Sequence, residues 1–192
     1  MIKKNILSDS IYRELTTNYT LEKLSENHII KILYNEHVEI LLKIKKIKQI
    51  AVQLIDPKID NKNDLLKKLN YLIVKVISAE PHHQREERIL FPFLKSLKIE
   101  TPIQSLTMEH EIMRKISNDL NFIIVKNYFS PKKLYYISEL SNRLCILFEN
   151  HIKKENVILF PLAINKIKDK ETLKRLKDES DDLGYCCFCP TN

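Results

Sequence analysis

The 192-residue chain contains a single glycine, Gly184. Tight β-turns and phosphate-binding loops depend on glycine, so its scarcity excludes hairpin-rich sheets and glycine-rich nucleotide loops. The chain also lacks an apolar run of about eighteen residues, which argues against a membrane span. Leucine, isoleucine, lysine and glutamate dominate, and 44% of the residues are hydrophobic while 30% are charged. This composition predicts one soluble all-α domain with a single core.

Cysteine is absent before Cys145, and the other cysteines crowd together near the end of the chain. Such a distribution provides no spaced disulfide framework. Polar residues interrupt the apolar residues of the N-terminal segment, which therefore does not look like a secretory signal peptide. We expect a cytoplasmic protein.

The net charge is +7 and the pI is about 9.1. An arginine-rich arm or a basic patch with interleaved aromatic residues would favour nucleic acid, but neither is present. The lysines alternate with acidic residues along helix faces, as they do on solvated surfaces. We expect neither nucleic acid nor a membrane as a partner.

One unusual string occurs twice, as residues 82–92 and 151–161, and both copies end in Ile-Leu-Phe-Pro. Aligning these tails places His82 on His151 and Glu86 on Glu155. Each copy then carries a histidine and a glutamate four residues apart, on one face of a helix. An imidazole and a carboxylate in this arrangement can coordinate one metal ion.

The apolar stripe that leads into the first string indicates a different register, because it points to His83 and Glu87 rather than to His82 and Glu86. We follow the tail alignment, in which a kink or bulge at Pro81 absorbs the one-residue shift. His83 and Glu87 are then outer hydrogen-bond partners of the ligands; in the other register they are the ligands themselves.

Apolar residues at spacings of three and four predict four long helices. Two of them carry the repeated strings, and the other two begin near Ile30 and Thr101. Each of the latter has one histidine, His37 or His110, in its apolar stripe. His28 is expected to cap the first helix or to face solvent. Candidate N-caps for the second, third and fourth helices are Asn63 or Asp64, Thr101 and Ser130.

The chain is therefore a duplicated helical hairpin with four inward imidazoles and two carboxylates. A lone histidine on an apolar stripe is ordinarily a hydrogen-bonded core residue. Burying two glutamates without compensation would cost several kcal/mol each, however, and a pair of cations is the natural compensation. Histidine and carboxylate together suit iron or manganese, whereas the lack of core cysteines argues against a thiolate zinc site. We predict two iron ions bridged by Glu86 and Glu155.

Four motifs together resemble the hemerythrin-like proteins with an HHE cation-binding domain: Asn35-Glu36-His37, residues 82–92, Met108-Glu109-His110-Glu111 and residues 151–161. The resemblance covers about residues 28–165. It implies an up-and-down antiparallel four-helix bundle with a non-haem di-iron centre (Fe²⁺/Fe³⁺) that is oxo- or hydroxo-bridged. It also implies that Glu86 and Glu155 bridge the irons and that their histidine ligands are His37, His82, His110 and His151.

Within this organisation we expect an N-terminal lead-in over residues 1–27 and the hemerythrin-like bundle over residues 28–168. Residues 169–192 should form a short helix over about Asp169 to Lys177, which residues 181–184 end with Gly184 as the stop, and a tail. Cys186 and Cys189 in that tail form a Cys-x-x-Cys pair, which suits a redox pair, a metal clip or a disulfide. A tail thiolate that reaches the bundle is a further hypothesis.

The resemblance also bears on function. Oxygen-carrying hemerythrins have another histidine one turn after the third-helix ligand, where this chain has Arg114. Two histidines per iron look more like the bacterial proteins that repair iron centres and the iron- and oxygen-sensing members. The repair proteins usually carry an N-terminal segment with cysteine, and residues 1–27 contain none.

The implied function is interaction with O₂, nitric oxide or peroxide, in the repair of iron–sulfur centres or in defence against nitrosative and oxidative stress. An iron–sulfur protein is the corresponding partner. The alternative is a non-catalytic iron or oxygen sensor, or an iron-binding module, that acts through a partner protein.

Overall fold

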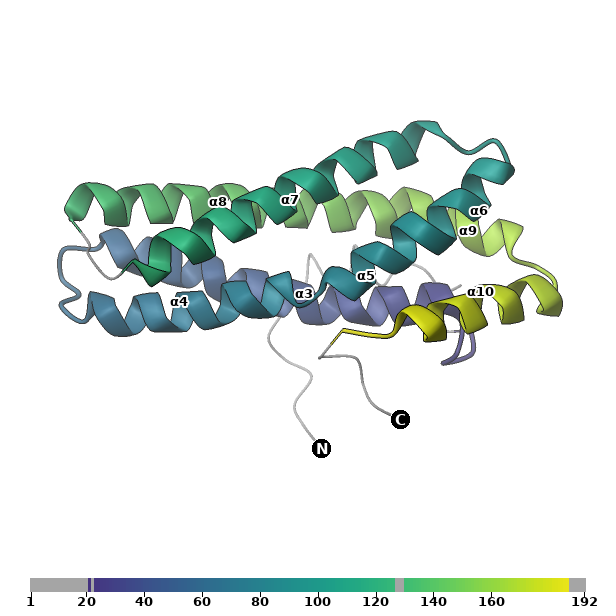
Figure 1. Cartoon of the computed structure of the whole chain (residues 1–192), viewed down its shortest axis with the longest axis horizontal. Coiled ribbons are helices and arrows are strands. Elements are labelled where there is room, and N and C mark those ends of the chain that lie inside the picture. The colour runs from purple at the N-terminus through teal and green to yellow at the C-terminus, as the bar shows by residue number, and fades with distance from the viewer. Residues whose placement is uncertain (1–20, 22, 127–129, 187–192) are drawn as a thin grey trace.

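The computed structural model describes residues 21, 23–126 and 130–186. All regular structure in these residues is helical, and four long rods lie side by side (Figure 1). The first and third rods are α3 (Ile29–Ile55) and α7 (Thr101–Val125). The second is built from α4 (Lys62–Ile77), α5 (Glu80–Arg85), the π-helical turn η1 (Glu86–Leu90) and α6 (Phe91–Ser96). The fourth is built from α8 (Pro131–Lys154), the π-helical turn η2 (Glu155–Leu159) and α9 (Phe160–Lys166).

The rods form a closed ring in chain order. Helix α3 packs against α4 and α8, while α7 packs against α4 and α8 from the opposite side. Successive rods run in opposite directions, as Figure 1 shows. The predicted up-and-down antiparallel four-helix bundle is confirmed.

Buried apolar residues form two clusters, one toward each end of the bundle. On α3 the division falls between Leu33, in one cluster, and Ile40, in the other, with His37 between them. On α7 it falls between Leu106 and Met113, with His110 between them. The polar core residues therefore form a layer between the two apolar clusters, which exclude water from both sides of this layer.

The second rod is interrupted where the kink was predicted. Helix α4 ends at Ile77, two residues form a turn, and α5 starts at Glu80 with Pro81 in its first turn. Proline cannot donate a backbone hydrogen bond, so it is tolerated at a helix start but not inside one. The interruption resets the helix phase, so that His82, rather than His83, meets His37 in the core.

Both repeated strings also contain a π-helical turn that the sequence analysis did not anticipate. The N–H groups of Phe91 and Phe160 donate to the carbonyls of Glu86 and Glu155, five residues earlier. The prolines that follow, Pro92 and Pro161, lack an N–H group, and a proline ring collides with the carbonyl four residues before it. Widening the preceding turn relieves that collision, so the Phe-Pro end of each string sets the conformation at its glutamate.

The helix starts partly match the expected caps. Ser130 caps α8 by accepting from the Lys133 N–H at 3.3 Å, as predicted. The expectation for α4 is wrong, because Asn61, one turn upstream of Asp64, accepts from its N–H. For α7 the cap position is Glu100 rather than Thr101, and it makes no side-chain cap bond. His28 caps α3 and is buried rather than solvent-facing.

Helix α10 (Lys170–Leu183) continues past Lys177 to the predicted stop and packs on α3, α5 and η1. It ends at Gly184, whose φ of 81° is a conformation that suits glycine and strains other residues. Over the described part of the chain, no helix is long and apolar enough to cross a bilayer.

Candidate metal centre

The four predicted histidine ligands meet in the polar layer as two pairs. The Nε2 atoms of His37 and His82 lie 3.0 Å apart, and those of His110 and His151 lie 2.9 Å apart. All four side chains are buried. The pairing joins the first rod to the second and the third to the fourth, so each half of the duplicated chain contributes one pair.

Glu86 and Glu155 lie between the two pairs. Glu86 Oε1 is 3.4 Å from His82 Nε2, and its Oε2 is 3.4 Å from His110 Nε2. Glu155 Oε2 is 3.3 Å from His151 Nε2 and 3.2 Å from His37 Nε2. Both carboxylates therefore reach both halves of the site, as bridging ligands do. The resulting groups are His37, His82, Glu86 and Glu155, and Glu86, His110, His151 and Glu155.

In each of the four histidines, the Nδ1 atom lies within hydrogen-bond distance of an acceptor oxygen. His82 Nδ1 is 2.7 Å from Glu36 Oε2, and His151 Nδ1 is 2.9 Å from Glu109 Oε2. The other two contacts are His110 Nδ1 to Glu87 Oε1 at 2.7 Å and His37 Nδ1 to Asn156 Oδ1 at 2.8 Å.

These contacts define the tautomer of a neutral imidazole. An Nδ1 that faces a carboxylate or amide oxygen carries the proton, so Nε2 presents its lone pair. Four lone pairs then point at one another and at two carboxylates. Among the described residues, the four oxygens of Glu86 and Glu155 have no hydrogen-bond partner. A buried space surrounded only by acceptors fits a cation, and this donor set fits two of them.

The electrostatics of the side chains lead to the same conclusion. Burial disfavours the charged form of His82, but the charge of Glu86 and the hydrogen bond to Glu36 raise its pKa to about 10. Burial likewise opposes charge on His151, whose pKa Glu155 and Glu109 nevertheless raise to about 9. The site attracts positive charge strongly enough to overcome burial.

The comparison with protein families decides the classification. A model of the hemerythrin HHE cation-binding domain matches residues 28–132. The chain belongs to this family. The match contains His37, His82, Glu86 and His110, while His151 on α8 and Glu155 in η2 lie beyond it. The search of curated proteins returned no match.

The hemerythrin-like centre is duplicated in its surroundings as well as in its core. Glu36 and Glu109 directly precede His37 and His110 in the chain, and each holds the histidine of the other helix in its half. Sequence reasoning named neither glutamate as a partner. The recurring Glu-His dipeptide was the available signal.

Glu87 and Asn156 occupy the same position in the two repeated strings, but they differ in chemistry, so the two halves of the centre are not identical. Glu87 supplies a carboxylate behind His110, whereas Asn156 supplies an amide oxygen behind His37. A carboxylate partner raises the basicity of a ligating imidazole more than an amide does. The imidazole of His110 is therefore expected to be a more basic metal ligand than that of His37.

The structure also places the two residues of the alternative register. Glu87 contacts His110 Nδ1 and belongs to neither candidate ligand group, so its outer role stays a prediction. His83 stacks on His110 with a centroid distance of 4.1 Å and belongs to neither candidate ligand group. Burial and the neighbouring charge of His110 lower the pKa of His83 to about 3, so its imidazole is neutral.

A buried ion pair supports the first half of the centre. Arg85 Nη2 donates to Glu36 Oε2 at 2.6 Å, and both residues are essentially inaccessible to solvent. The equivalent residue in the second string, Lys154, contacts Glu109 but remains 43% exposed. The same position in the repeat thus carries a buried cation in one half and a surface cation in the other.

The C-terminal segment covers that buried pair. The Tyr185 ring lies 4.5 Å from the Arg85 guanidinium carbon, and the Cys186 thiol donates to Glu36 Oε1 at 3.1 Å. Cys186 therefore reaches the bundle, one side chain away from His82. Cys189, the other cysteine of the predicted Cys-x-x-Cys pair, lies outside the described residues. The proposed role of the pair stays a hypothesis.

Proposed function

We propose that this hemerythrin-like protein is a non-haem di-iron protein that handles O₂, nitric oxide or peroxide. The observation that supports this most directly is the buried layer of four Nε2 lone pairs and two bridging carboxylates, with all Nδ1 positions occupied by acceptors. This set has no thiolate, and it suits iron better than structural zinc.

In this proposal His37 and His82 hold one metal ion, and His110 and His151 hold the other, with Glu86 and Glu155 between them. When bound, a pair of iron ions supplies electrons in single steps and coordination positions for a small molecule. The protein orients the imidazoles through Glu36, Glu87, Glu109 and Asn156. The apolar clusters on both sides exclude water from the layer.

The first test is an anaerobic metal count and optical spectrum of the purified chain, followed by exposure to oxygen and then to nitric oxide. We expect about two irons per chain, matching the two ligand groups, and charge-transfer bands that change with each gas. Folded protein with no iron, or with a single zinc per chain, would contradict the di-iron proposal.

Metal affinity should rise steeply with pH. Binding must displace the protons that the metal-free site holds on His82 and His151, whose pKa values are raised to about 10 and about 9. Below pH 9 we expect the apparent affinity to rise by up to roughly a hundredfold per pH unit, tenfold for each of the two protons released. Anaerobic competition titrations against a chelator of known pH dependence, between pH 6 and 9, measure the slope. A flat profile contradicts the ligand assignment.

A second candidate function is that of an iron or oxygen sensor acting through a partner protein. The contact that favours it joins Cys186 to Glu36, because Glu36 also holds His82. Metal occupancy would then bias how the C-terminal segment sits on the bundle and what it presents to a partner.

An iron–sulfur protein that receives iron is the partner that the repair role requires.

A further inference from the structure

A cavity of about 270 Å³ lies beside the centre, between α4, α5, α7 and α8. Its volume is about nine times the roughly 30 Å³ that one water molecule occupies in the liquid. A diatomic gas would fill only a small part of it. The cavity is therefore large enough for a molecule of several non-hydrogen atoms.

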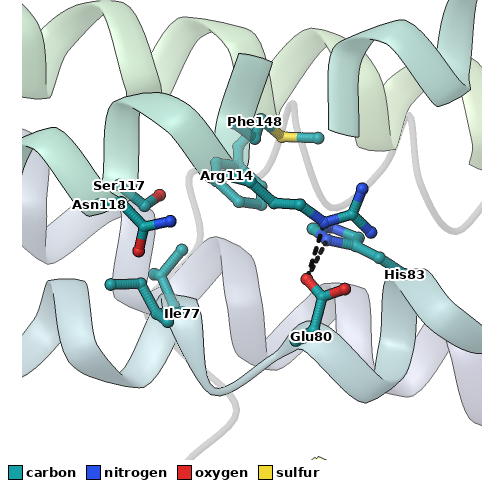
Figure 2. A pocket seen from close by; sticks show the side chains of 9 residues that line it. Ile77, Glu80, His83, Arg114, Ser117, Asn118 and Phe148 are labelled. Carbon is teal, nitrogen blue, oxygen red and sulfur yellow. Dashed lines mark hydrogen bonds and ion pairs between the residues drawn. The ribbon is translucent and has the colours of Figure 1, made fainter. Parts of the chain in front are cut away.

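Its lining is mixed. Val76, Ile77, Met113 and Phe148 provide apolar walls. Figure 2 shows Glu80, His83 and Arg114 gathered at one side of the cavity, with Ile77, Ser117 and Asn118 at the other. A cavity with apolar walls and a few grouped polar side chains is the usual form of a small-molecule site.

The charged side chains of the lining neutralise each other. Arg114 Nε donates to Glu80 Oε2 at 2.9 Å, and Arg114 Nη1 lies 2.9 Å from Glu87 Oε1. The guanidinium therefore already faces two carboxylates, and an anionic ligand would meet no net positive charge. An uncharged molecule meets no such obstacle.

One buried polar atom in the lining has no hydrogen-bond partner in the described part of the chain. His83 Nδ1 is buried and makes no hydrogen bond, since the nearest carboxylate oxygen, on Glu80, is 3.9 Å away. Buried polar atoms of this kind are normally satisfied by water or by a ligand. The His83 ring also separates the cavity from the centre. It stacks on His110 of the centre, and its centroid lies 6.2 Å from that of Phe148 in the cavity lining.

We propose that this cavity binds a small uncharged molecule with an apolar body and a terminal hydroxyl, the class to which alkyl hydroperoxides belong. The oxygen end lies at His83 and Arg114, and the alkyl or aryl body lies against Val76 and Ile77. This proposal names the substrate class of the peroxide-handling site, and to that extent it rests on the proposed function. Arg114 links the cavity to the metal ligands, because Glu87 contacts both Arg114 and His110.

The probe for the test is 2-phenyl-2-propanol, the unreactive alcohol that corresponds to cumene hydroperoxide, titrated into the iron-loaded full chain by calorimetry. We expect saturable binding, and benzoate should bind at least roughly tenfold more weakly because it is charged. Ile77→Trp fills the cavity from its partly buried edge and should weaken alcohol binding by at least roughly tenfold. His83→Phe keeps a stacking ring but removes Nδ1, and a loss of about fivefold to tenfold is expected.

The matched control is Ile55→Trp, which adds the same bulk at an exposed position at the end of α3, outside the cavity. It should bind the alcohol like the unmodified chain. Equal affinity in Ile77→Trp, tighter binding of benzoate, or no saturable binding at all would overturn the proposal.

Iron counts and gas-dependent spectra of the same samples separate this proposal from the proposed function. A chain that loads iron and responds to gas but does not bind the alcohol refutes the cavity proposal alone. A chain that binds the alcohol in the cavity but loads no iron refutes the di-iron function and leaves a small-molecule site beside an empty cluster.

Discussion

Replacing the two carboxylates that lie between the histidine pairs, as Glu86→Gln with Glu155→Gln, is expected to abolish metal binding. Each glutamate lies within 3.4 Å of a histidine Nε2 in both halves of the layer, so the double change removes both negative charges that the cations need. Loss of an outer partner in metal sites typically costs 10- to 100-fold in affinity, and we expect a loss beyond about 100-fold here.

The double variant should also lose metal-dependent stability. Metal at about one hundred times its dissociation constant stabilises a folded protein by about 2.7 kcal/mol. For a domain of this size that corresponds to an increase in melting temperature of roughly 5 to 10 °C. We expect this increase in the unmodified chain and none in the double variant, by calorimetry with and without metal.

Glu149→Gln is the control for the carboxylate change. Glu149 lies on α8, two turns before the π-helical turn, and pairs with Lys48 on the surface. Its replacement removes one carboxylate charge of the same kind without touching the centre, so metal count and metal-dependent stability should be unaffected. A Glu86→Gln, Glu155→Gln chain that still holds its full complement of iron would refute the bridging assignment.

Arg85→Met is expected to destabilise the protein by about 3 to 5 kcal/mol, the usual cost of removing one partner of a buried ion pair. Glu36 would be left buried without its cation. Burial opposes ionisation of Glu36, and it is His82 and Arg85 that hold its pKa at about 2. The melting temperature should fall by roughly 6 to 20 °C.

The repeat supplies its own control, because Lys154 occupies the equivalent position of the second string. Its side chain is 43% exposed, and exposed ion pairs contribute about 0 to 1 kcal/mol. Lys154→Met should therefore change the melting temperature little. Combining Arg85→Met with Glu36→Gln should restore part of the lost stability, since no buried charge then remains unpaired.

Equal effects of Arg85→Met and Lys154→Met in thermal unfolding would contradict this assignment. They would show that burial does not distinguish the two ion pairs. The comparison is informative because both side chains follow their histidine by three residues and precede their glutamate by one.

The register of the first string illustrates how local sequence determined the core of the site. The apolar stripe alone pointed to His83, and the tail alignment pointed to His82. Pro81 decides between them by interrupting the helix, and Pro92 and Pro161 act in the same way on the turns at the two glutamates. These effects extend over only four or five residues along the chain, so they can be inferred from sequence.

The partners behind the ligands could not be inferred in this way. Glu36 and His82 are 46 residues apart, and His37 and Asn156 are 119 apart. Which side chains meet across helices depends on the rotation and axial offset of each helix, which the packing of the whole core sets. The same holds for Arg85, which the sequence suggested only as one more charged residue of a helix.

The sequence by itself determined the four helices, the duplication and the inward-facing histidines and glutamates, because helical periodicity and proline act locally. Only the tertiary structure decided that Glu87 and Asn156 make the two halves unequal, that Cys186 contacts Glu36, and that a cavity lies beside His83. Those features arise where segments that are far apart in the sequence meet. Their geometry is a property of the assembled bundle, which no single stretch of residues encodes.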